Sequence, residues 1–261
     1  VRVQLDDGDP VELDTERSTS VPWPFDAVRA GAEHTVRVAV RGEDGPWSPW
    51  SRPVRFSTAL REGEWTAEFI GAAADSPAAA PLYARQEFTV ASAVRRATLY
   101  ATAHGVYQVS VNGADVDDHL FKPGWTAYRQ RLAYEATDVT ALVRVGRNAI
   151  GVRAAGGWYT EKYGFGETAR RHYGSRPEVS AELRIEYADG RAEVIRTDAE
   201  WRVSSHGELV SSGLYAGETI DARRRMPGWD RPDFDDTGWQ RATASAGTTA
   251  PRPVDVEPVR R

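Results

Sequence analysis

The sequence predicts an all-β protein made of two successive β-sandwich domains. Short segments with alternating apolar and polar residues recur along the chain, and clusters of turn-forming residues separate them. Helical periodicity is nearly absent. With 261 residues, of which 41% are hydrophobic, the chain is long enough to bury a sizeable core. We therefore expect a partial sandwich followed by an antiparallel jelly-roll β-sandwich.

The first 60 residues read as strands separated by turns. Val1–Leu5 alternates in the manner of a half-buried strand, and Thr35–Val40 does so again before a turn at Asp44. The sequence P-W-S-P-W-S at Pro46–Ser51 and a last strand at Val54–Phe56 follow. This order resembles the C-terminal half of a fibronectin type III domain, so residues 1–60 are predicted to be such a domain lacking its N-terminal part.

Two tryptophans of this domain have a structural interpretation. In fibronectin type III domains the W-S region packs along a strand edge, and prolines there discourage pairing with other edges. We therefore interpret Trp47 and Trp50 as edge and core packing residues rather than as ligand-binding residues.

A second domain is predicted from residue 61 to residue 250. Leu60–Trp65 marks its beginning, and the alanine- and proline-rich Ala72–Pro81 reads as an exposed loop. Residues 251–261 are expected to link this domain to a following one. The predicted strands are Tyr83–Val90, Arg96–Ala103, Val106–Val111, Arg131–Tyr134, Asn148–Ala154, Val179–Tyr187, Ala192–Thr197 and Trp201–Ser204.

Local signals support this reading of the second domain. Tyr107, Val109 and Val111 fall on one face of their strand, so that face should cover the core. Asn112-Gly113 supplies the two positive-φ positions of a tight hairpin. Asp138 is a plausible N-cap of one helical turn. Trp201, Trp229 and Trp239 are predicted to be core and corner residues.

Composition excludes several functions. The net charge of -5 has both signs interspersed, so we expect no nucleic acid as a partner and no attachment to an anionic membrane. No apolar run is long enough to cross a bilayer. The absence of cysteine excludes disulfides and thiolate chemistry, and the scattered histidines argue against a histidine-built metal site. Because the chain starts at Val1, we expect it to be part of a longer protein.

Five motifs occur in an informative order: V-N-G-x-x-V, P-G-W-T-x-Y, Y-x-x-x-D-V-T-x-L, G-x-N-x-I-G-V and G-G-W-Y. Further motifs follow at Ser212–Glu218, Ile220–Arg223, Gly228-Trp229 and Phe234–Trp239. Together they resemble the N-terminal jelly-roll domain of bacterial α-L-rhamnosidases of glycoside hydrolase family 78. The resemblance extends over nearly the whole chain.

The resemblance implies where the chemistry of the parent enzyme lies. Rhamnosidases of this family are inverting hydrolases whose acidic catalytic residues lie in a helical barrel C-terminal to these β domains. The chain alone should therefore be inactive, bracing a downstream catalytic domain and helping to engage rhamnose-containing glycans. A self-contained glycosidase domain and a cell-surface protein-interaction module remain alternatives. The location is left open, with an extracellular bacterial parent protein favoured.

A catalytic pair within the chain has candidates but no fixed partners. Inverting hydrolysis requires two carboxyl groups about 6.5 to 9.5 Å apart. The acids considered are Glu161, Glu167, Glu218, Asp221, Asp230, Asp233, Asp235 and Asp236. Because they lie among turn residues, we interpret them as solvated or turn-capping groups, and no catalytic residue is assigned.

Asp115, Asp117 and Asp118 are candidates for a calcium site, because some sugar-binding jelly rolls hold calcium with aspartates. The cluster follows a hairpin and lacks the glycine and terminal glutamate of a helix-loop-helix calcium loop. Solvated turn acids are the preferred interpretation. No metal or other cofactor is therefore assigned, and calcium is kept as an alternative.

The predicted binding surface is an aromatic loop at Gly156–Gly166. Sugars are bound by aromatic faces beside polar groups, and glycines allow a loop to project from a sheet. Aromatic residues also favour docking against another domain, so carbohydrate binding and docking on the catalytic domain both stay open. The candidate residues are Trp158, Tyr159, Glu161, Lys162 and Tyr163, with Trp125 and Tyr128 as neighbours.

Overall fold

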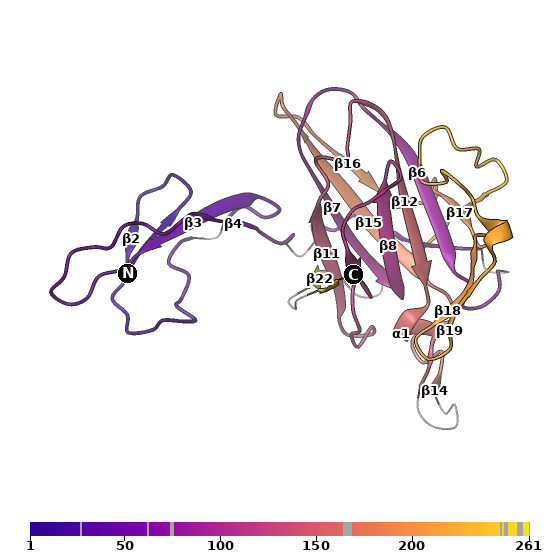
Figure 1. Cartoon of the computed structure of the whole chain (residues 1–261), viewed down its shortest axis with the longest axis horizontal. Helices are drawn as coiled ribbons and strands as arrows, with labels where there is room; N and C mark the ends of the chain where they lie inside the picture. The colour runs from indigo at the N-terminus through magenta and orange to yellow at the C-terminus, as the bar shows by residue number, and fades with distance from the viewer. Residues whose placement is uncertain are drawn as a thin grey trace. The chain divides into compact units, whose positions relative to one another are not determined.

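The computed structural model divides the chain into two compact units, Val1–Arg61 and Glu62–Arg261. The described residues are 1–26, 28–61, 63–73, 76–163, 169–245, 247, 250–254 and 258–260, with the backbone alone at 163, 169 and 170. Each unit consists of β-sheets (Figure 1), whose described strand pairs are antiparallel except for the parallel pair of β11 and β22 in the second unit. The predicted all-β class is confirmed.

The first unit contains a four-stranded antiparallel sheet in the order β2-β1-β3-β4. Its strands are β1 (Arg2–Leu5), β2 (Val11–Glu12), β3 (Glu33–Ala39) and β4 (Val54–Ser57). The W-S region lies along β3, because the amides of Ser48 and Ser51 donate to the carbonyls of Val40 and Val38, each at 2.8 Å.

Arginines cover both tryptophans of this region. The guanidinium of Arg2 lies 4.2 Å from the ring centre of Trp47, and that of Arg37 lies 4.8 Å from the ring centre of Trp50. Such cation–π contacts cover the rings with the long arginine side chains. The interpretation of Trp47 and Trp50 as edge-packing residues is confirmed.

Two sheets form the body of the second unit. In the first, the order is β21-β5-β15-β7-β11-β22, with β16 also paired to β15; in the second it is β20-β17-β6-β12-β8-β9. The bounds in the first sheet are β5 (Phe69–Gly71), β7 (Val94–His104), β11 (Leu132–Asp138), β15 (Glu178–Tyr187), β16 (Ala192–Arg196), β21 (Thr243–Ser245) and β22 (Pro251–Pro253). In the second they are β6 (Leu82–Val90), β8 (Val106–Val111), β9 (Ala114–Asp115), β12 (Gly146–Ala155), β17 (Arg202–Ser204) and β20 (Gln240–Arg241).

Three strand pairs and two short helices complete the second unit. The pairs are β10 (His119–Leu120) with β23 (Val259–Arg260), β13 (Lys162–Tyr163) with β14 (Ala169–Arg170), and β18 (Leu209–Gly213) with β19 (Gly217–Ile220). The helices are α1 (Gly157–Thr160) and the 3-10 helix η2 (Ala222–Arg224). Within the described part of the chain, no helix has the length and apolar character needed to span a membrane.

The largest apolar cluster of the described residues lies between the two sheets. Leu99 and Leu183 come from the first sheet, and Val109, Ile150 and Val152 come from the second; each is at most 2% exposed. The alternation along β8 therefore directs its odd-numbered residues to the core, as predicted. Trp201 and Trp239 are buried at 1% and 9% exposure, so their predicted packing roles are confirmed.

The predicted turns are also present. Asn112 and Gly113 have φ values of 54° and 81°, so both adopt the left-handed conformation of a tight hairpin between β8 and β9. The Asp138 carboxylate accepts a hydrogen bond from the amide of Thr140 at 2.9 Å. After it, the carbonyl of Val139 accepts hydrogen bonds from the amides of Leu142 at 2.9 Å and Val143 at 3.3 Å, so the predicted single turn is present and is too short to form a helix.

Residues 229–236, which we call the covering segment, close part of the outer face of the second sheet. Arg85 on β6 is 2% exposed, and its guanidinium donates to the carbonyls of Trp229 at 2.8 Å and Arg231 at 3.0 Å and also pairs with Asp236. Gly151 on β12 lies opposite Arg85 in the sheet. A Cβ atom at Gly151 would lie 2.8 Å from the Trp229 ring, so this ring packs directly on the glycine backbone.

We predict that Gly151→Ala lowers the free energy of unfolding by about 1–3 kcal/mol, because its methyl group overlaps the Trp229 ring. Chemical denaturation at neutral pH measures this change. Gly238→Ala is the control, since no atom lies within 4 Å of its added methyl group. Equal stabilities of the two variants would contradict the close packing of Trp229.

Candidate functional site

The predicted aromatic loop begins as a packed helical turn. Residues Gly157–Thr160 form α1, in which Gly157 and Thr160 are buried. Gly157 has a φ of 44°, and a Cβ atom there would lie 2.7 Å from the Val106 side chain. The expectation that these glycines let the loop project is therefore wrong for α1, because they bring it against the sheet. Residues 164–168 of the predicted loop lie outside the described residues.

Tyr159 is part of a stack of rings beneath α1. Its ring lies parallel to that of His104, with centroids 4.7 Å apart, and Phe69 stacks on the other face of the imidazole at 4.3 Å. His104 is fixed by its Nδ1, which lies 2.8 Å from the Glu178 carboxylate. Burial raises the pKa of Tyr159, so the phenol stays protonated at neutral pH. Tyr159 is thus mainly a support for α1.

Tyr128 is also a support rather than an exposed platform. It is 2% exposed and belongs to a core cluster with Phe69 and Leu132. Its ring contacts Tyr159 edge-on at 5.2 Å. A direct contact between the Tyr128 ring face and a ligand is therefore contradicted by its burial.

Three aromatic rings do reach the surface together, and we call Phe121, Trp125 and Trp158 the aromatic rim. Trp125 is 57% exposed and lies parallel to Trp158, at 3° between planes and 6.5 Å between centroids. Phe121 is 49% exposed and contacts Trp158 edge-on at 6.0 Å. The predicted neighbours Trp125 and Trp158 are thus brought together, and Phe121 is an addition to the predicted set.

The polar candidates of the loop lie beside α1. Glu161 accepts a hydrogen bond from the amide of Leu214 at 2.7 Å, so it attaches the end of α1 to the β18–β19 hairpin. Lys162 is exposed on β13. The side chain of Tyr163 lies outside the described part of the structure.

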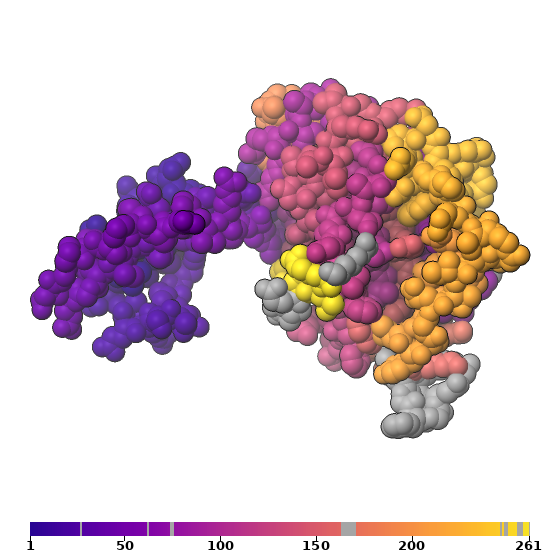
Figure 2. Space-filling view, in the orientation of Figure 1, coloured from indigo at the N-terminus to yellow at the C-terminus, as the bar shows by residue number. Residues whose placement is uncertain are grey.

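A groove of about 580 Å³ adjoins the aromatic rim. Phe121 forms part of its wall, Gln108 on β8 and Arg153 on β12 line its sheet side, and Leu214 and Ile220 line its hairpin side. Figure 2 shows the orange segment that contains β18 and β19 alongside the magenta strands of the second sheet. This groove was not predicted from the sequence, because Gln108 and Arg153 carry no motif of their own.

Several candidate acids have structural partners. Asp233 pairs with Arg147, and Asp236 pairs with Arg85. Hydrogen bonds from Arg223 lower the pKa of Asp221, and those from Thr237 lower the pKa of Asp235, so both carboxyls are ionised at neutral pH. Glu218 and Asp230 lie in the described structure, whereas Glu167 lies outside it.

The three aspartates weighed for calcium have different environments. Asp115 is exposed at the end of β9, and Asp118 pairs with Arg260 at 2.8 Å. Asp117 has a side chain only 9% exposed, and both of its oxygens accept hydrogen bonds from the Lys122 ammonium, at 2.9 and 2.8 Å. The interpretation as a solvated turn acid is therefore wrong for Asp117, because its carboxylate forms a buried ion pair with Lys122.

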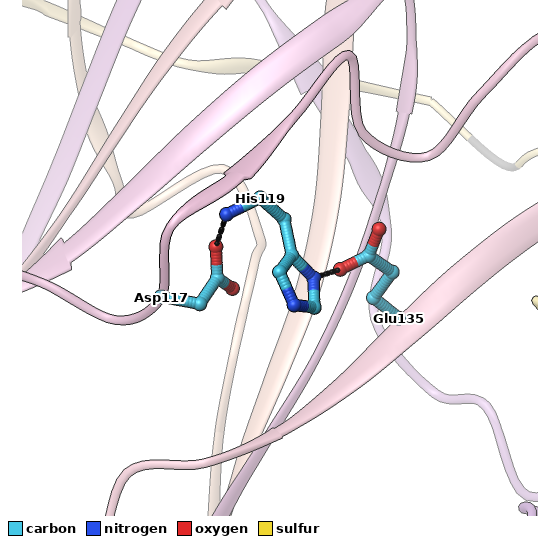
Figure 3. Close-up of side chains that lie close together, drawn as sticks. All are labelled: Asp117, His119 and Glu135. Atoms are coloured by element: carbon cyan, nitrogen blue, oxygen red, sulfur yellow. Dashed lines mark hydrogen bonds and ion pairs between the residues drawn. The ribbon is translucent and has the colours of Figure 1, made fainter. Parts of the chain in front are cut away.

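Asp117 also takes part in the one group of metal-ligand type found among the described residues. Ligand atoms of Asp117, His119 and Glu135 lie within 4.8 Å of one another (Figure 3). The His119 Nδ1 lies 2.8 Å from the Glu135 carboxylate, and the His119 amide donates to Asp117 at 2.9 Å. The Lys122 ammonium also donates to both oxygens of Asp117, so these four residues form one hydrogen-bonded network.

Asp117 and Lys122 are the buried ion pair of this network. Burial raises the pKa of Asp117, but the hydrogen bonds and the charge of Lys122 outweigh it, so the pKa falls below its ordinary value of 3.8. Lys122 is 3% exposed. Each of the two charges therefore depends on the other for compensation.

We predict that Lys122→Met lowers the free energy of unfolding by about 3–5 kcal/mol at pH 7, because Asp117 loses its buried cation. Since the pKa of Asp117 is lowered in the folded state, the pair stabilises the fold above the unfolded-state pKa and stops doing so as the pH falls through the folded-state value. The difference between variant and parent should thus shrink in acid. Urea titrations across a pH series measure it.

The control for this prediction is Lys162→Met, which removes the only other lysine of the chain from an exposed position. It should leave the stability almost unchanged at every pH. A loss in Lys122→Met that stays constant from neutral pH into acid would contradict the assigned ion pair.

Comparisons with known proteins agree on one family. Residues 92–261 match the family described as the α-L-rhamnosidase N-terminal domain, and residues 2–62 match the Rha78A-like N-terminal immunoglobulin domain. An α-L-rhamnosidase of Alteromonas sp. is 34% identical over 86% of this chain, and one of Formosa agariphila is 33% identical over 84%. The chain spans only 25% and 24% of the lengths of these two relatives.

Solved structures give the same result. The α-L-rhamnosidase of Aspergillus terreus is 34% identical to this chain, with a TM-score of 0.84. The match covers 94% of this chain and 29% of the Aspergillus chain. The α-L-rhamnosidase of Streptomyces avermitilis, solved with L-rhamnose, shares the fold with a TM-score of 0.87 at 21% identity over 95% of this chain and 41% of its own. This chain therefore belongs to the α-L-rhamnosidase N-terminal domain family.

Proposed function

We propose that this chain is a non-catalytic N-terminal segment of an α-L-rhamnosidase, which braces the catalytic part and helps it to engage rhamnose-containing glycans. The observation that carries the proposal is the aromatic rim. It presents exposed ring faces on a support of packed rings, and such faces suit the C–H surfaces of sugars.

The bracing role is supported by the contacts that hold the rim in place. Trp158 sits on α1, which is held by the stack of Tyr159 and His104 below it and by the bond from Leu214 to Glu161 beside it. A surface held on both sides loses little conformational freedom when it binds a ligand or a domain.

A non-catalytic role is supported by the uses of the acidic residues. The carboxylates of Asp221, Asp235 and Asp236 hold turns or the covering segment, and two of them have lowered pKa values. A general acid requires a raised pKa instead. Hydrolysis by the complete enzyme is accordingly proposed to occur outside this chain.

In the longer protein that carries this chain, Trp125→Ala should raise the KM for a rhamnose-containing oligosaccharide about three- to tenfold with little change in kcat, because one stacking face is lost. Steady-state hydrolysis measures this effect. Trp125 is well exposed, so its removal should preserve the fold.

The matched control is Trp23→Ala, which removes an exposed tryptophan from the first unit. Its KM should equal that of the parent protein. An unchanged KM in Trp125→Ala would contradict the role of the rim, and release of rhamnose by the isolated chain would contradict the non-catalytic role.

A further inference from the structure

We propose that the groove beside the aromatic rim is a binding site for one neutral sugar residue of the 6-deoxyhexose class, with the ring of Phe121 as its wall. The inference rests on the proposed function for the choice of sugar. Its position, however, follows from the groove itself, which has the volume of a small-molecule site at about 580 Å³.

The sheet side of the groove carries fixed polar groups. Arg153 on β12 lies directly opposite Gln108 on β8, and its guanidinium donates to the Gln108 Oε1. The Glu208 carboxylate lies 3.9 Å from Arg153 on another side. Arg153 supplies donors and Glu208 supplies acceptors at adjacent positions, which is the arrangement that neighbouring sugar hydroxyls require.

The charges of the lining favour a neutral ligand. Arg153 is its one cationic residue, and Glu208 and Glu218 are its two acidic residues. Glu208 also pairs with Arg225 at 2.9 Å. Because the positive charge of the groove is already compensated, a phosphate or carboxylate would gain no net attraction there. A polyhydroxylated neutral ring gains hydrogen bonds without bringing a charge.

The wall of the groove is held in an unusual backbone conformation. Phe121 has a φ of 57°, which is rare for a bulky residue and costs free energy. Two backbone hydrogen bonds maintain the turn, from Tyr107 to the carbonyl of Lys122 at 3.1 Å and from Gly124 to that of Phe121 at 2.8 Å. Residues in such conformations occur often at ligand sites, and Phe121 exposes 49% of its surface at this groove, which supports a role in binding.

The remaining walls are apolar and set the expected specificity. Leu120, Leu214 and Ile220 line the groove near its polar floor. A methyl group at C6 of the sugar gains from contact with such side chains, whereas a hydroxyl there would lose its hydration. The groove is therefore expected to prefer an L-rhamnoside to the corresponding L-mannoside.

The test is an NMR titration of this chain with methyl α-L-rhamnoside and, separately, methyl α-L-mannoside, which carries an additional hydroxyl at C6. We expect millimolar binding of the rhamnoside and weaker binding of the mannoside. Arg153→Met should weaken rhamnoside binding about tenfold, because it removes charged hydrogen bonds. Phe121→Gly should also weaken it, and glycine accepts the positive φ without strain.

Arg147→Met is the matched control, since Arg147 lies on the same strand but pairs with Glu87 and Asp233 away from the groove lining. It should bind like the parent chain. Absence of rhamnoside binding, or binding that Arg153→Met and Phe121→Gly leave unchanged, would overturn the inference. Binding lost only in Trp125→Ala would move the sugar to the rim and also overturn it. Rhamnose release by the chain alone would instead contradict the proposed function.

Discussion

The buried ion pair of Lys122 and Asp117 positions the aromatic rim and the Phe121 wall of the groove. Lys122 comes directly after Phe121 and its carbonyl is bonded to β8, so its side chain and backbone together hold the turn. The same turn leads to Trp125. Because neither charge can be left buried alone, the pair ties the aromatic rim to the segment between β9 and β10 that carries Asp117.

Successive side chains of a strand point to opposite faces of the sheet, and this alternation determines which residues line the groove. On β8 and β12 the residues that alternate with the core residues face outward, and this brings Arg153 and Gln108 side by side. Part of the outer face is closed by the covering segment that Arg85 holds. Beside the covering segment, the groove lies between the β18–β19 hairpin and the strands β8 and β12.

The local features of the fold were predictable from sequence. The alternation along Val106–Val111 and the dipeptide Asn112-Gly113 depend on neighbouring residues alone, and the structure has both as expected. The predicted strands of the second domain correspond closely to β6, β7, β8, β11, β12, β15, β16 and β17.

The candidate site was predictable only in part, because contacts distant in sequence build it. Trp125 and Trp158 were expected together and do stack. The burial of Tyr128 depends on packing against Phe69, which no local pattern reveals. Likewise, Glu208 meets Arg153 only after the chain has crossed both sheets, so its place in the groove carries no signal in the sequence.

The central claim is that a sugar residue binds beside Phe121 in the groove of the second unit. A crystal structure of this chain grown with methyl α-L-rhamnoside tests it most directly. We expect sugar density against the Phe121 ring, with sugar hydroxyls hydrogen-bonded to Arg153 and Glu208. Density on the exposed face of Trp125 with an empty groove, or no sugar at all at saturating concentration, would contradict it.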